Sequence, residues 1–134
     1  MEVVVKNAQR EVPVRAARMA RLARCAVRRL RIRAAGEMSI TFIATGPMRR
    51  LNKRFLRHDR PTDVLSFRYD APTPPAATRF VVGEILIAPR EAQRYATRHG
   101  LAYEEELGRY VVHGLLHWLG YDDRTRAQQR HALR

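Results

Sequence analysis

Two histidines are the residues of this sequence best suited to carry chemistry. His113 and His117 stand four residues apart in the segment 113–123, which reads HGLLHWLGYDD. On a helix this spacing puts both side chains on one face, with Cβ atoms roughly 5–6 Å apart. Imidazole nitrogens bind zinc at about 2.0–2.1 Å, so two rings at this separation can share one ion. The spacing therefore predicts a pair of metal ligands on one helix.

A third ligand is expected just beyond that helix. Gly120 suits the left-handed conformation that ends a helix, and a turn there brings Asp123 toward the same ion. Three protein ligands leave a fourth position for water, which is typical of catalytic zinc sites. We therefore predict one zinc ion per chain, held by His113, His117 and Asp123. The alternative is that both histidines are core residues of an apolar helix.

The residue after the first histidine bears on the reaction class. Zinc peptidases of the H-E-x-x-H type place a glutamate there as the general base, whereas this sequence has Gly114. Loss of a general base costs roughly 10²–10⁴-fold in rate. A zinc peptidase is therefore placed third, after the two RNA-related hypotheses given below. RNA cleavage remains open, because the 2′-hydroxyl of RNA can attack the adjacent phosphate while a metal polarises the phosphoryl oxygen.

Strands and helices that alternate along the chain must position these residues. Strands are expected at residues 2–6, 38–44, 64–67 and 80–87. Helices are expected at residues 13–31, 47–57, 89–98 and 103–119. The side chains of the first helix expected to face the core are Val14, Ala17, Leu22, Cys25, Ala26 and Leu30. This order predicts the α+β class, with a small mixed sheet of about four strands packed with helices.

Composition narrows the class of partner. The chain has 134 residues, which fits one domain over residues 1–134, and a net charge of +13. A charge of this size attracts polyanions and favours ribosomal RNA or another nucleic acid, although a solvated arginine-rich surface is the alternative. Cys25 is the single cysteine, and no apolar run is long enough to cross a bilayer. A cytoplasmic protein without a membrane partner is expected.

Three blocks of the sequence resemble the YbeY family of bacterial endoribonucleases. HGLLHWLGYD resembles the family signature H-G-x-L-H-L-x-G-Y-D-H. The segment 51–67, LNKRFLRHDRPTDVLSF, resembles L-N-x-x-Y-R-G-K-D-x-P-T-D-V-L-S-F, and Gly83-Glu84-Ile85 resembles the family's G-D-I strand. The blocks occur in family order. The resemblance implies a zincin-like fold, a bound zinc ion, and a role in 16S rRNA maturation and ribosome quality control.

Two positions depart from the family pattern. Asp123 stands where the family has a third histidine ligand, and a carboxylate there could shift the preference toward manganese or another metal. Leu56 stands where the family has an arginine thought to face the substrate phosphate. Arg54 and Arg57 are candidates to supply that charge, because guanidinium groups bind phosphate in a bidentate manner. The alternative is that both are ordinary surface arginines.

The residues and the resemblance together predict a metal-dependent, single-strand-specific endoribonuclease. Its expected role is maturation of the 3′ end of 16S rRNA and ribosome quality control, with the 30S subunit as partner and no DNA partner. A second hypothesis is an assembly factor that binds rRNA or a ribosomal protein and cleaves weakly or not at all.

Overall fold

The computed structural model describes residues 1–56, 63–69 and 80–120. Along this part of the chain the elements are β1 (Glu2–Ala8), α1 (Ala16–Arg29), β2 (Glu37–Ile43), α2 (Thr45–Leu56), β3 (Val64–Arg68), β4 (Val81–Ile87), α3 (Pro89–His99) and α4 (Tyr103–Leu119). Every strand and helix expected from the sequence is present. The largest differences in bounds concern α1, which begins and ends inside the predicted range.

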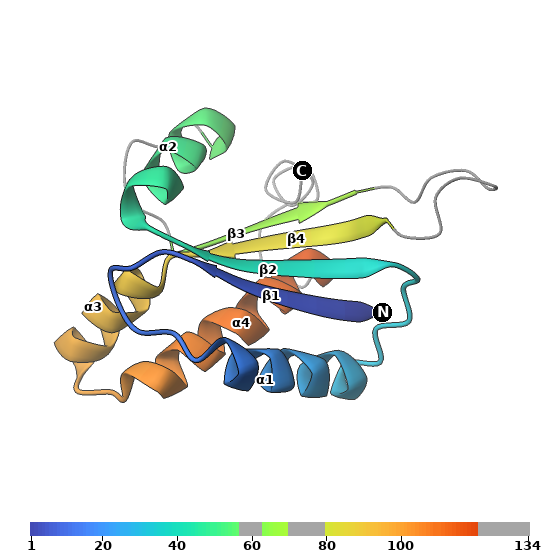
Figure 1. The fold of residues 1–134 in the computed structure, drawn as a ribbon, viewed down its shortest axis with the longest axis horizontal. Coiled ribbons are helices and arrows are strands. Elements are labelled where there is room, and N and C mark those ends of the chain that lie inside the picture. The colour runs from blue at the N-terminus through green and yellow to red at the C-terminus, as the bar shows by residue number, and fades with distance from the viewer. Residues whose placement is uncertain (57–62, 70–79, 121–134) are drawn as a thin grey trace.

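The four strands form one mixed sheet in the order β1-β2-β4-β3. β1 and β4 both pair parallel with β2, whereas β3 pairs antiparallel with β4. Figure 1 shows α1, α3 and α4 on one face of the sheet and α2 on the other. The predicted α+β class with a small mixed sheet is therefore confirmed. β3 lies at the edge of the sheet, with α4 packed beside it.

The main core lies between the sheet and the two helices α1 and α4. Alternate residues of the strands face it, because successive side chains of a strand point to opposite faces. The fully buried side chains among them include Met38, Ile40, Phe42, Ile85 and Ile87 of the strands, and Val111 and Leu115 of α4. Burial of each stabilises the fold by roughly 1.5–3 kcal/mol. α4 is thus fixed on the sheet by its apolar side.

The most deeply buried residues of α1 are not the predicted ones, although four of those predicted, Val14, Leu22, Ala26 and Leu30, pack against the core at its margin. Met19, Ala23 and Val27 are buried, at spacings of four residues, while Ala17 is exposed. Leu22 and its neighbours at helical spacing pack at the margin of the core instead. The helix is rich in alanine and arginine, so the apolar pattern alone did not distinguish between these two neighbouring faces. The larger side chain of Met19 occupies the core.

A second, smaller cluster holds α2 on the opposite face of the sheet. Leu65 and Phe67 of β3 point toward α2, where Met48 is fully buried. The rings of Phe55 and Phe67 meet edge to face, with centroids 5.3 Å apart. β3 is therefore held between two helices, with alternate side chains facing α2 and α4. No helix within the described ranges is long and apolar enough to span a membrane.

Candidate metal centre

α4 carries the two histidines, and its ends are well defined by the sequence. Three acidic residues, 104–106, occupy its first turn, where negative charge is favourable to the helix dipole. Gly120 ends the helix with a φ of 89°, and its N–H donates to the His117 carbonyl at 2.9 Å. The predicted glycine stop is confirmed. His117 therefore lies in the last turn, directly before the change of chain direction.

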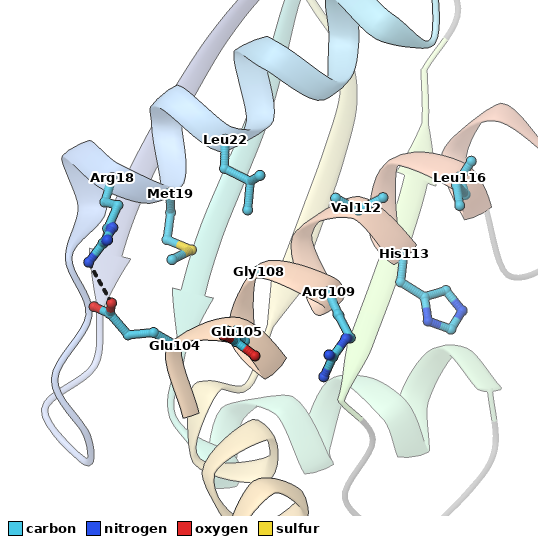
Figure 2. Close-up of a pocket in the computed structure, with 10 residues that line it drawn as sticks. All are labelled: Arg18, Met19, Leu22, Glu104, Glu105, Gly108, Arg109, Val112, His113 and Leu116. Atoms are coloured by element: carbon cyan, nitrogen blue, oxygen red, sulfur yellow. Dashed lines mark hydrogen bonds and ion pairs between the residues drawn. The ribbon is translucent and has the colours of Figure 1, made fainter. Parts of the chain in front are cut away.

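The two imidazole rings lie close together on one side of α4. Their centroids are 4.4 Å apart, with ring planes inclined at 62°. His113 is exposed and His117 is half-buried. Figure 2 shows His113 extending from α4 on the side away from α1. Two nitrogens at about 2.0–2.1 Å from one ion fit rings at this separation, so the pair suits a metal such as zinc.

Of the other predicted site residues, the structure describes only Arg54. Asp123 and Arg57 lie outside the described residues, so the three-ligand site stays a prediction. In residues 1–56, 63–69 and 80–120 there is no group of three or more histidine, cysteine, aspartate or glutamate side chains that could hold a metal. Arg54 is exposed in the last turn of α2, with its guanidinium 5.5 Å from the centre of the Phe55 ring.

Gly114 shows why this helix has no glutamate at the position of a peptidase base. A Cβ atom at Gly114 would lie 2.6 Å from Cγ2 of Ile85, a side chain that is fully buried. Position 114 therefore faces β4 and leaves no room for a side chain. The Gly114 carbonyl also accepts a hydrogen bond of 3.0 Å from the buried Ser66 hydroxyl. Close packing, and not water activation, is the role of this position.

Tyr110 and Asp63 link the start of β3 to α4, one turn before His113. Burial raises the pKa of Tyr110 well above its usual value, and the charge of Asp63 and its hydrogen bond with the tyrosine add to the rise. The Asp63 carbonyl accepts the Ala88 N–H at 2.9 Å. Asp63 thus joins the start of the edge strand both to α4 and to the residue that precedes α3.

The end of α4 is fixed by an arginine that the sequence did not single out. The Arg68 guanidinium lies 4.8 Å from the centre of the Trp118 ring and donates to the Trp118 carbonyl. The Trp118 indole N–H in turn donates to the Val82 carbonyl at 3.3 Å. A Cβ at Gly83 would lie 2.3 Å from the Trp118 Nε1, so only glycine fits there. Trp118 is therefore a packing residue that joins α4 to β4.

A groove of about 770 Å³ lies between α1 and the outer side of α4, and His113 lines one end of it. Met19, Leu22, Val112 and Leu116 give it apolar walls (Figure 2). Its arginines are paired with acids: Arg18 with Glu104 at 2.7 Å, and Arg109 with Glu106 at 2.8 Å. These contacts leave the groove poorly suited to bind phosphate.

Comparisons with known proteins show which family this chain resembles. The model of the family described as Endoribonuclease YbeY matches residues 4–133. An Endoribonuclease YbeY from Thermobifida fusca is 37% identical over 126 residues, which cover 91% of this chain and 81% of that protein. One from Acidothermus cellulolyticus is 36% identical over 130 residues, with 91% and 79% covered.

A solved structure extends the agreement to the fold. The solution structure of a Thermotoga maritima protein superposes with a TM-score of 0.53 at 19% sequence identity, and the match covers 94% of this chain and 77% of that one. The extent of the family match and the identity to curated relatives then settle the relationship. The chain belongs to the endoribonuclease YbeY family.

Proposed function

We propose that this protein is a metal-dependent endoribonuclease that cleaves single-stranded ribosomal RNA, in maturation of the 16S rRNA 3′ end and in ribosome quality control. The observation that carries the proposal is the pair of imidazoles on α4, with ring centroids 4.4 Å apart. Membership of a family of endoribonucleases supplies the reaction class. The net charge of +13 supports a polyanionic substrate in the cytoplasm, with the 30S subunit as its source.

In this proposal, some residues bind the metal and others hold α4 in place. His113, His117 and Asp123 would hold one zinc ion, which supplies Lewis acidity at the phosphoryl oxygen. Gly114 admits no glutamate beside the first ligand, so the chain offers no base of the peptidase type. The attacking group is then the 2′-hydroxyl of the substrate itself, which bonds to the adjacent phosphorus as the bond to the 5′-oxygen of the next nucleotide breaks. The 5′-oxygen takes up the proton, so the products are a 2′,3′-cyclic phosphate and a 5′-hydroxyl. Ser66 and Arg68 hold α4 in place through the carbonyls of Gly114 and Trp118.

Cleavage of a single-stranded 16S rRNA 3′ fragment tests the proposal. We expect wild-type protein to cleave it, and a chelator or the His117→Ala variant to abolish turnover, because both remove the metal. His99→Ala is the matched control, since His99 is exposed on α3 and stacks on Tyr95 at 4.1 Å. It should retain full activity. Equal cleavage by His117→Ala and His99→Ala contradicts the proposal.

The second candidate function is an assembly factor that binds rRNA or a ribosomal protein. The observation that favours it is Leu56 at the end of α2, because the YbeY family pattern has arginine at this position. Such a factor would keep its affinity for the 30S subunit under chelation and in His117→Ala, and wild-type protein would show no turnover.

A further inference from the structure

A second pocket lies at the end of the sheet where β2 and β4 begin. It has a volume of about 630 Å³ and is formed where the turn after α1 meets the last turn of α4. Arg31 and Arg33 come from that turn, Tyr69 and Phe80 flank the ends of β3 and β4, and Trp118 lines it from α4. Figure 1 shows α1 ending at the same end of the sheet as the starts of β2 and β4. We call it the arginine pocket.

The backbone of Arg31 is unusual. Within the described ranges it is the single residue other than glycine with a positive φ, 54°. Its N–H donates to the Arg28 carbonyl and the Ile32 N–H to the Val27 carbonyl, both at 3.1 Å. These two bonds form a Schellman motif, whose left-handed position normally holds glycine. α3 and α4 follow that rule with Gly100 and Gly120, whereas α1 places an arginine there.

An L-residue in this conformation costs free energy that glycine would avoid. Strained residues of this kind cluster at functional sites, where the side chain has a role that glycine lacks. The side chain of Arg31 is exposed and lines the pocket. The free-energy cost of the left-handed backbone at Arg31 is therefore explained if its guanidinium binds a ligand.

The arginines of the turn are available for an anion. The sequence between Glu11 and Glu37 holds eight arginines and no acidic residue. Arg31 and Arg33 are exposed, and neither has an ion pair with the described residues. Arg68, in contrast, is occupied by its contacts with Trp118. Guanidinium groups bind phosphate through two parallel hydrogen bonds, so Arg31 and Arg33 suit a phosphate group.

Aromatic side chains form another wall of the pocket. Tyr69 is 43% exposed, and its hydroxyl donates to the Glu84 carboxylate at 3.1 Å, which limits rotation of the ring. Phe80 is half-buried beside it. A fixed, exposed ring next to unpaired arginines is the arrangement that binds single-stranded nucleic acid, since the base stacks while the phosphate is neutralised.

We propose that the arginine pocket binds one nucleotide of the single-stranded RNA substrate, with its phosphate at Arg31 and Arg33 and its base against Tyr69. The inference rests on the proposed function, because that function supplies an RNA strand. Trp118 lines the pocket and directly follows His117 in α4. The pocket therefore borders the last turn of α4, which also carries His117.

The variant Arg31→Gly tests the pocket without risk to the fold. Because glycine is favoured at this backbone position, its melting temperature should equal or exceed that of the wild type. Its affinity for a short, unstructured oligoribonucleotide should fall, measured by fluorescence anisotropy in the His117→Ala background so that the RNA stays intact. The slope of log K against log salt should decrease in magnitude by roughly 0.7, the value for one phosphate on a single strand.

Arg98→Gln is the charge-matched control for Arg31→Gly. Arg98 is exposed on α3, and its replacement removes one positive charge far along the chain from the pocket. It should leave the salt slope unchanged. The stacking part of the proposal is tested by Tyr69→Ala, expected to weaken binding by roughly tenfold. Tyr69→Phe keeps the ring and loses only the hydroxyl that limits its rotation, so it should bind much more tightly than Tyr69→Ala.

Three results would overturn the inference. The first is an Arg31→Gly variant with the same affinity and salt slope as Arg98→Gln. The second is equal binding by Tyr69→Ala and Tyr69→Phe. The third is equal competition by polyphosphate or by an acidic peptide, which would make the pocket a general anion site. If wild-type protein fails to cleave RNA while Arg31→Gly still weakens binding, the pocket stands and the proposed nuclease function falls.

Discussion

Single residues explain why the predicted metal site on α4 lacks the glutamate base of a zinc peptidase. His113 and His117 are placed by helical spacing, which any reader of the sequence can infer. Gly114 has a role that only the structure shows, because the space that its Cβ would need is filled by Ile85. The contacts of Ser66 and Arg68 with α4 were also beyond sequence reasoning, since each joins residues about fifty positions apart.

The turn at Arg31 was missed for a related reason. The predicted helix ran to residue 31, because no glycine or proline marks an earlier end. The structure ends α1 at Arg29 and places Arg31 in the left-handed region. A helix stop without its usual residue leaves no local signal, so the arginine pocket could not be predicted from the sequence.

Tyr103 gives a prediction at the residue scale that depends on pH. Its hydroxyl donates to the Pro13 carbonyl at 2.6 Å, and burial, with the charge of Glu104, raises its pKa from 10.0 to about 12. A raised pKa means that the folded state holds the proton more tightly than the unfolded chain. The stabilisation is therefore complete below pH 10 and is lost as pH rises toward 12.

The measurement is urea unfolding of wild type and Tyr103→Phe from neutral to alkaline pH. The free energy of unfolding of the wild type should fall more steeply than that of the variant above pH 10. Parallel curves would show that the Tyr103 hydroxyl does not contribute.

At the scale of elements, hydrophobic periodicity predicted every strand and helix of the described chain. The buried face of α1 was predicted only in part, since alanines on both sides of Met19 gave two similar apolar stripes. Periodicity thus found the elements, but side-chain size decided which face is buried.

The contact of α4 with β4 makes a prediction at this scale. Gly114→Ala should lower the free energy of unfolding, because the added methyl group meets Ile85 and overpacks the core at a cost of about 1–3 kcal/mol. The greater helix propensity of alanine offsets only about 1 kcal/mol of this. Urea denaturation measures the change, and metal binding should weaken with it as α4 shifts.

Gly108→Ala serves as the control for Gly114→Ala. A Cβ at Gly108 would meet only the terminal Cδ2 of Leu22, at 2.9 Å, and that half-buried side chain can turn away. Its stability should stay near that of the wild type. Equal destabilisation by the two variants would show that the contact with Ile85 has no special weight.

At the scale of the whole molecule, the proposed metal site and the proposed nucleotide pocket both lie along α4. The histidine pair, the apolar groove next to α1 and the arginine pocket all border this helix. The class of the fold could be predicted from the order of elements. Of the predicted metal ligands, the structure places His113 and His117 close together, whereas Asp123 lies outside the described residues and stays a prediction.

The central claim is a metal site built on His113, His117 and Asp123, and metal content tests it most directly. Protein purified without chelators or metal-affinity resin is analysed by mass spectrometry, as wild type, His117→Ala, Asp123→Ala and the control His99→Ala. We predict about one zinc per chain in wild type and control, and loss in the other two variants. Wild-type protein without bound metal, or an Asp123→Ala variant with full zinc, would contradict the three-ligand site.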